Sequence, residues 1–148
     1  MELLNLVGMG GTFDHLHEGH KLLIKTALSI SHQVVIGLTG EKMLKKKKHA
    51  SKIESYETRK RNLEKFISNV ADKNRVKIIE LNDPYGPPIK EPEYEGLIVS
   101  QETYQSALRL NESRQSNNLK PLIIIVIPMI KGEDNQRYSS TAIRAKLK

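Results

Sequence analysis

Apolar residues along the chain follow two patterns that alternate from one end to the other. Short continuous apolar runs, such as residues 122–127, are typical of strands that are buried on both faces. Between these runs, apolar residues recur at spacings of three and four, as at Leu63, Phe66 and Ile67, which is the pattern of a helix with one buried face. The runs predict strands over residues 3–7, 34–38, 76–81, 97–99 and 122–127. The periodic segments predict helices over residues 19–31, 56–71, 103–117 and 140–148.

Strands that alternate with helices in this way form a parallel sheet with helices on both faces. We therefore expect an α/β fold of the doubly wound kind, with a five-stranded parallel sheet, and a single domain over residues 1–148. Ligands of such sheets bind beyond the carboxyl ends of the strands. That rule selects the segments after the strands, namely residues 10–20, the lysine run after residue 44, and residues 84–88, 100–103 and 138–141.

Composition narrows the class of protein. The chain has no cysteine, which excludes disulfides and thiolate metal sites. Its apolar runs are far too short to cross a membrane and its first residues lack the basic start of a signal peptide, so we expect a cytoplasmic protein without a membrane partner. The net charge of +7 equals the excess of ten Lys and Arg over three Glu between Lys42 and Lys65. One basic segment with few aromatic residues suits a small polyphosphate better than nucleic acid, although a solvated surface loop would look the same.

The segment G-G-T-F-D-H-L-H-E-G-H, residues 10–20, lies between the first predicted strand and the first predicted helix. It is compatible with a metal site, a phosphate site or a tight turn with surface histidines. A zinc site of the H-E-x-x-H kind is disfavoured, because His17 and His20 are three residues apart and no third ligand is obvious. Phosphate fits better, since Gly10 and Gly11 let a ligand approach the backbone, the helix start attracts an anion, and imidazoles donate hydrogen bonds.

Four stretches carry a resemblance to a known family. G-T-F-D at residues 11–14 with H-E-G-H at residues 17–20 resembles the first signature of the nucleotidyltransferase superfamily. Y-S-S-T-A-I-R at residues 138–144 is similar to its second signature, I-S-S-T-x-I-R, with Tyr in place of the leading Ile. L-N-D-P-Y-G-P-P at residues 81–88 and V-S-Q-E-T-Y at residues 99–104 resemble the phosphopantetheine adenylyltransferases of archaeal and eukaryotic type. The arginine-rich stretch that the bacterial enzymes carry after the fourth strand is replaced here by S-Q-E-T.

The resemblance implies a reaction and its substrates. AMP would be transferred from ATP to 4'-phosphopantetheine, giving dephospho-coenzyme A and pyrophosphate, a step of coenzyme A biosynthesis. Mg²⁺ would arrive with ATP and no metal would be held by the protein, while coenzyme A or dephospho-coenzyme A would be a product or a possible inhibitor. Such a transfer needs no covalent intermediate, so positioning and charge neutralisation can supply the catalysis.

The resemblance and the chemistry together select candidate site residues. We expect His20 to donate to the α-phosphate as charge builds on it, Thr12 to contact the attacking phosphate, and Lys45, with Lys47 in reserve, to contact the reacting phosphates. The expected ATP contacts are Gly10, Gly11, Thr12, Phe13, His17, His20, Ser139, Ser140, Thr141 and Arg144. The expected phosphopantetheine contacts are Thr12, Lys45, Arg59, Asp83 and Tyr85.

Several of these residues have a purely structural alternative. Asp14 is interpreted as a cap of its own turn in preference to a catalytic base. Ser139 and Ser140 would also cap the last helix, a role that is compatible with phosphate binding. Asp83 and Tyr85 either shape the phosphopantetheine pocket or only form a proline-rich turn.

Two other functions are compatible with parts of the sequence. Transfer of a nucleotide to nicotinamide mononucleotide, flavin mononucleotide or glycerol 3-phosphate would use the same first and last signatures, and residues 81–88 and 99–104 argue against it. A nucleotide- or RNA-binding module that has lost catalysis would be expected to carry a damaged signature, yet both histidines and both serines are present.

Overall fold

The computed structural model describes residues 3–44 and 52–128. Several predictions therefore lie outside the described residues: those for Lys45, Lys47, Ser139, Ser140, Thr141 and Arg144, and for the helix over residues 140–148.

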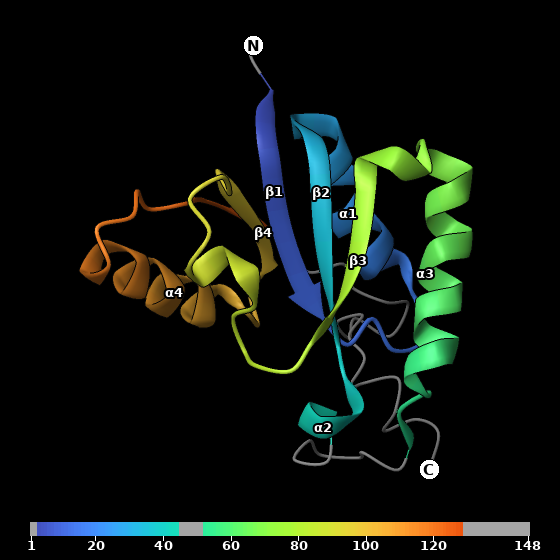
Figure 1. Ribbon diagram of the computed structural model, residues 1–148. Coiled ribbons are helices and arrows are strands. Elements are labelled where there is room, and N and C mark those ends of the chain that lie inside the picture. Colours follow the sequence, from blue (N-terminus) through green and yellow to red (C-terminus); the bar gives the residue numbers. More distant parts are fainter. Residues whose placement is uncertain (1–2, 45–51, 129–148) are drawn as a thin grey trace.

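Within the described residues, five parallel strands form one sheet in the order β3-β2-β1-β4-β5 (Figure 1). The strands are β1 (Leu4–Gly11), β2 (Ser31–Thr39), β3 (Val76–Leu81), β4 (Gly96–Ser100) and β5 (Ile123–Ile127). The helices are α1 (Glu18–Ile30), α2 (Glu41–Leu44), α3 (Tyr56–Val70) and α4 (Tyr104–Ser116), with two short 3₁₀ turns, η2 (Lys73–Arg75) and η3 (Pro87–Ile89). The strand order reverses between β1 and β4, so the carboxyl ends of these two strands mark the point where ligands of such sheets bind. This confirms the predicted fold class.

Helices cover the two faces of the sheet separately (Figure 1). On the first face, α1 and α3 bury one set of alternating strand residues, including Val7, Val34 and Ile36. On the second face, α4 packs with the intervening set, including Leu97 and Val99. This alternation follows from the strand geometry, in which successive side chains point to opposite faces.

Strand β1 is longer than the sequence predicted. The apolar run ends at Val7, and Gly10 and Gly11 were expected in the following loop, but the strand continues to Gly11. Its last residues pair with β2, Gly10 opposite Gly37 and Gly11 opposite Leu38. Glycine has a low strand propensity, so local sequence argues for a loop, whereas pairing with a neighbouring strand overrides that preference.

The described helices contain no candidate membrane span. Within residues 3–44 and 52–128, none is long and apolar enough to cross a bilayer.

Candidate active site

Two histidines shape the start of α1, at the carboxyl edge of the sheet. His17 is the N-cap residue, and its Nδ1 accepts a hydrogen bond of 3.1 Å from the backbone N–H of Gly19. The Nδ1 of His20 accepts one of 3.3 Å from the backbone N–H of His17. This is a reciprocal capping box in which imidazoles replace the usual hydroxyl and carboxyl groups. Because both Nδ1 atoms accept, a neutral ring at either position carries its proton on Nε2.

The two rings stack on one another, with centroids 3.8 Å apart and planes inclined by 23°. Burial, with a smaller contribution from the neighbouring His17, lowers the pKa of the His20 imidazole to about 3. Burial also lowers the pKa of His17, partly offset by the charge of Glu18. Both rings are therefore neutral at pH 7. Each is a hydrogen-bond donor through Nε2 at the positive end of a helix, a combination that favours phosphate oxygens.

We expect His20 to make stability depend on pH. Its pKa falls from 6.5 to about 3 on folding, so between these values the unfolded chain binds a proton that the folded chain does not. The stability that His20 contributes is complete above pH 6.5 and is lost as the pH falls, by at most about 1.4 kcal/mol per pH unit. Urea unfolding at pH 7, 6, 5 and 4 should show a steeper loss for the wild type than for His20→Asn. The exposed His32, changed to Gln, is the control, and an equal slope in wild type and His20→Asn would contradict the expectation.

The residues between β1 and α1 form a tight turn. Phe13 and His15 adopt left-handed backbone conformations, with φ of 49° and 47°, which are unusual for residues with a side chain. Phe13 is 2 % exposed, and the centroid of its ring lies 5.2 Å from that of the His20 ring. The His20 imidazole therefore packs against a buried side chain of the turn. Thr12 is buried in the same turn. The left-handed conformations of Phe13 and His15 are strained, and such strain persists only where the surrounding structure imposes it.

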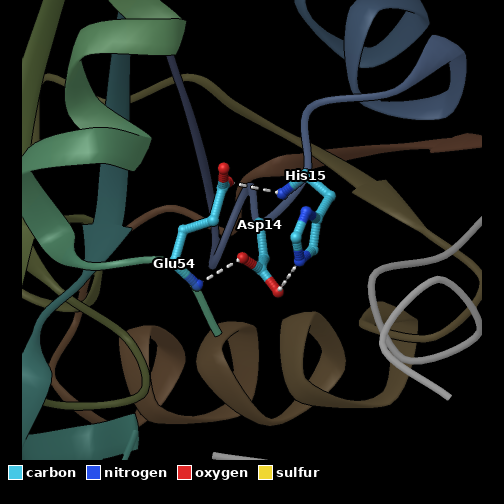
Figure 2. A group of neighbouring side chains, drawn as sticks. All are labelled: Asp14, His15 and Glu54. Carbon is cyan, nitrogen blue, oxygen red and sulfur yellow. Dashed lines mark hydrogen bonds and ion pairs between the residues drawn. The ribbon is translucent and has the colours of Figure 1, made fainter. Parts of the chain in front are cut away.

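Asp14 holds that turn against the segment before α3 (Figure 2). Its buried carboxylate accepts a hydrogen bond of 2.9 Å from the backbone N–H of Glu54. In return, Oε1 of Glu54 accepts one of 2.8 Å from the backbone N–H of His15. Asp14 therefore makes a structural contact with a residue forty positions away, beyond its own turn.

Arg59 lies fully buried beneath the same edge. Its Nη1 donates to the carbonyls of Thr12 (3.0 Å) and Thr39 (2.8 Å). Thr12 directly follows β1, and Thr39 is the last residue of β2. Its Nε donates to the carbonyl of Glu54 at 2.9 Å. Burial lowers the pKa of this guanidinium, and the charges of nearby carboxylates offset part of the effect. These described hydrogen bonds make Arg59 a positioning residue, and the contact with phosphopantetheine that the sequence suggested stays a prediction.

A cavity of about 220 Å³ opens on the second face, beside the same strand ends. Its floor is the sheet where Gly8, Gly10 and Gly37 replace side chains, and its walls are mostly apolar. Leu81 packs across Gly10 and Gly37: a Cβ on Gly37 would lie 2.6 Å from the Cγ of Leu81, and one on Gly10 would lie 3.2 Å from its Cδ1. The polar groups around the cavity are few, with the hydroxyls of Thr39, Thr103 and Ser106 among the lining residues. The cavity thus suits a slender, largely apolar ligand.

The loop after β3 forms one wall of this cavity. The carboxylate of Asp83 accepts from the backbone N–H groups of Tyr85 (3.0 Å) and Gly86 (2.7 Å). Gly86 has a φ of 67°, which a residue with a side chain rarely adopts. Tyr85 lines the cavity, whereas Asp83 is exposed and shapes the turn that presents it.

The structure brings the sequence-predicted residues of the first signature together. Gly10, Gly11, Thr12, Phe13, His17 and His20 all lie at the end of β1 or in the turn to α1. Sequence reasoning missed Gly8, Gly37 and Glu54. The alternation of Gly8 with Gly10 in β1 was a readable signal, but the partner Gly37 and the contact of Glu54 depend on pairing between distant segments.

Comparison with known proteins places the chain in a family. A model of the cytidylyltransferase-like family matches residues 9–146. The chain is 43% identical to the phosphopantetheine adenylyltransferase of Pyrococcus abyssi, over 95% of this chain and 89% of that one. It is 36% identical to the phosphopantetheine adenylyltransferase of Saccharomyces cerevisiae, over 97% of this chain and 49% of that one. The chain belongs to the phosphopantetheine adenylyltransferase family.

Solved structures agree with that family's fold. A protein from Archaeoglobus fulgidus, described as of unknown function, has a TM-score of 0.74 and 29% identity over 86% of this chain and 89% of that one. A bifunctional NMN adenylyltransferase/ADP ribose pyrophosphatase from Francisella tularensis has a TM-score of 0.65 over 97% of this chain and 41% of that one. At 18% identity, this second likeness concerns the fold alone. Membership of the phosphopantetheine adenylyltransferase family confirms what residues 11–20, 81–88 and 99–104 indicated.

Proposed function

We propose that the protein transfers the adenylyl group of ATP to 4'-phosphopantetheine, giving dephospho-coenzyme A and pyrophosphate. The observation that carries the proposal is that the apolar cavity opens at the same strand ends as the two histidine donors. Gly10 and Gly11 line the cavity and also lead into the turn that ends at His17. An acceptor with a long arm and a terminal phosphate can therefore lie along the cavity with its phosphate beside the donors. Family membership supports the same reaction.

The chemistry requires one bond to form and one to break. An oxygen of the acceptor phosphate attacks the α-phosphorus of ATP, and the bond to pyrophosphate breaks with its electron pair on the leaving group. Charge that builds on the non-bridging α-phosphate oxygens is met by the Nε2–H of His20, while His17 and the amides at the start of α1 hold the phosphates. Thr12 and the main chain of Gly10 and Gly11 are proposed to contact the same groups.

Further contacts are proposed on residues outside the described ranges. Lys45 would contact the reacting phosphates, and the other proposed phosphate contacts are Ser139, Ser140, Thr141 and Arg144. Imidazoles and backbone amides suit phosphate oxygens better than they suit Mg²⁺, which prefers oxygen ligands. The Mg²⁺ of this reaction is therefore proposed to come bound to ATP, where it neutralises phosphate charge. A cytoplasmic location fits these substrates and belongs to the proposal.

The choice of acceptor can be tested by pyrophosphate release from ATP and Mg²⁺. We expect turnover with 4'-phosphopantetheine and little with nicotinamide mononucleotide, flavin mononucleotide or glycerol 3-phosphate. Turnover with a mononucleotide and none with phosphopantetheine would show that the proposed acceptor is wrong. The proposal of nucleotidyl transfer would still hold.

The same assay tests the cavity through Ser106→Leu. Ser106 lines the cavity from α4, so a larger apolar side chain there narrows it. We expect the KM for phosphopantetheine to rise about tenfold or more, with the KM for ATP within about twofold. Gln105→Leu, at an exposed position of the same helix, is the matched control. Equal KM values for phosphopantetheine in both variants would show that the acceptor binds elsewhere.

A further inference from the structure

Three potential metal ligands, Asp14, His15 and Glu54, lie close together where the turn after β1 meets the segment before α3. Figure 2 shows the His15 ring beside the Asp14 carboxylate, the backbone N–H of Glu54 at the same carboxylate, and the Glu54 carboxylate at the backbone N–H of His15. One potential ligand atom from each lies within 4.8 Å of those from the other two. Asp14 is fully buried and the other two are half-buried. The arrangement joins segments that are about forty residues apart in sequence.

The backbone preorganises these groups. One carboxylate oxygen of Asp14 is held by the N–H of Glu54, and one of Glu54 by the N–H of His15. The left-handed conformation of His15 directs its ring back toward Asp14, and Nε2 lies 3.6 Å from Oδ2. The carbonyl oxygen of Lys52 lies 3.5 Å from the same Nε2.

These distances are those of neighbouring ligands around one ion. They are longer than the usual span of a hydrogen bond, about 2.7–3.2 Å. Two ligands bound tetrahedrally at about 2.0–2.2 Å from a single ion lie about 3.3–3.6 Å apart. The three ligand atoms are within 4.8 Å of one another. Rotation of the half-buried Glu54 side chain would therefore bring its carboxylate to an ion that the other two residues bind.

The chemistry of the donors also selects a class of ion. Carboxylates and imidazoles are both ligands that divalent cations bind in proteins. An imidazole nitrogen in the set favours Zn²⁺ and its transition-metal neighbours over Mg²⁺ and Ca²⁺, which prefer oxygen alone.

We propose that Asp14, His15 and Glu54 bind Zn²⁺, with the carbonyl of Lys52 as a fourth ligand. The ion would tie the turn after β1 to the start of α3 and so fix the loop that carries His17. It is separate from the Mg²⁺ that is proposed to arrive with ATP. The expectation that the protein holds no metal came from the family resemblance, and the spacing argument against zinc concerned only His17 and His20, whereas this site needs residues from two segments.

The test uses the full chain, stripped with a chelator that is then removed, in the absence of ATP. Calorimetric titration with Zn²⁺ should give one ion per chain, and Mg²⁺ or Ca²⁺ should bind at least tenfold more weakly. Zn²⁺ at a hundredfold excess over its Kd should raise Tm by about 5–10 °C. His15→Gln and Glu54→Gln should each weaken binding tenfold or more, since even residues behind the ligands cost about that much. Glu54→Gln keeps an oxygen for the N–H of His15, which preserves the local fold.

Two controls make the outcome decisive. His32→Gln, at the exposed start of β2, should bind Zn²⁺ like the wild type. His17→Gln should do the same, whereas loss of binding in this variant with retention in His15→Gln would place the ion at the stacked histidines and overturn the proposal. Absence of stoichiometric Zn²⁺ binding, or wild-type affinity in folded Glu54→Gln and His15→Gln, would also overturn it. None of these measurements involves adenylyl transfer, so the two proposals can fail separately.

Discussion

His20→Ala is expected to lower kcat by about 10²- to 10³-fold, equivalent to about 3–4 kcal/mol in the activation barrier. The neutral ring offers an Nε2–H at the helix start, and its proposed hydrogen bond to the α-phosphate would strengthen as charge builds in the transition state. A donor used mainly in the transition state affects kcat more than substrate binding, so the KM for ATP should change much less. Steady-state kinetics of pyrophosphate release measures both quantities.

The capping contact of His20 adds a second effect. Its Nδ1 accepts from the N–H of His17, so alanine should also cost about 1 kcal/mol of stability. His20→Asn separates the two roles, because its side-chain oxygen can replace Nδ1 as acceptor while no donor reaches the position of Nε2. His20→Gln extends far enough to place an N–H there. We expect near wild-type stability and low kcat for Asn, and partly recovered kcat for Gln. Wild-type kcat in the Asn variant would leave the ring with a capping role only.

Arg59→Met is expected to destabilise the fold by about 3–5 kcal/mol, the largest stability effect predicted here. The change removes donors from the carbonyls of Thr12, Thr39 and Glu54, and a buried carbonyl left without a donor costs about 1–3 kcal/mol. Arg59→Lys keeps the charge but lacks the planar fork that reaches several acceptors, so an intermediate loss is expected. Urea unfolding measures these free energies.

Arg61→Met is the matched control, because Arg61 is exposed on the same helix and such substitutions usually change stability by less than about 0.5 kcal/mol. A positioning role predicts that kcat falls in the folded fraction of Arg59→Lys, since both strand ends shift. Unchanged stability with a raised KM for phosphopantetheine would show that the guanidinium binds the substrate directly, as the sequence suggested.

Local sequence was enough to predict the order of the five described strands and of α1, α3 and α4, but not the short α2 or the 3₁₀ turns. The run over residues 76–81 became β3 with the same bounds, and the helix predicted over residues 56–71 became α3 (Tyr56–Val70). Both patterns reflect burial on one or two faces, a property that repeats within a few residues. The chemistry proposed for residues 10–20 could be inferred for the same reason, since the glycines and histidines that are proposed to bind phosphate are neighbours in the chain.

The bounds of β1 could not be predicted locally. Gly10 and Gly11 have the propensity of a loop, and only the pairing of Gly10 with Gly37 makes them strand. That register also aligns Gly10 and Gly37 on the second face, where they make room for Leu81, which lines the cavity.

The sequence by itself determined that His17 and His20 flank a helix start, and that the family's signatures occur in the correct order along the chain. Tertiary structure decided that each Nδ1 accepts a backbone hydrogen bond, that burial holds His20 neutral, and that Arg59 is enclosed among carbonyls. It also brought Glu54 to Asp14 across forty residues. The division follows from physics: periodicity and turn chemistry act between neighbours, whereas proton affinity, tautomer and hydrogen-bond partners depend on which distant groups exclude water from a side chain.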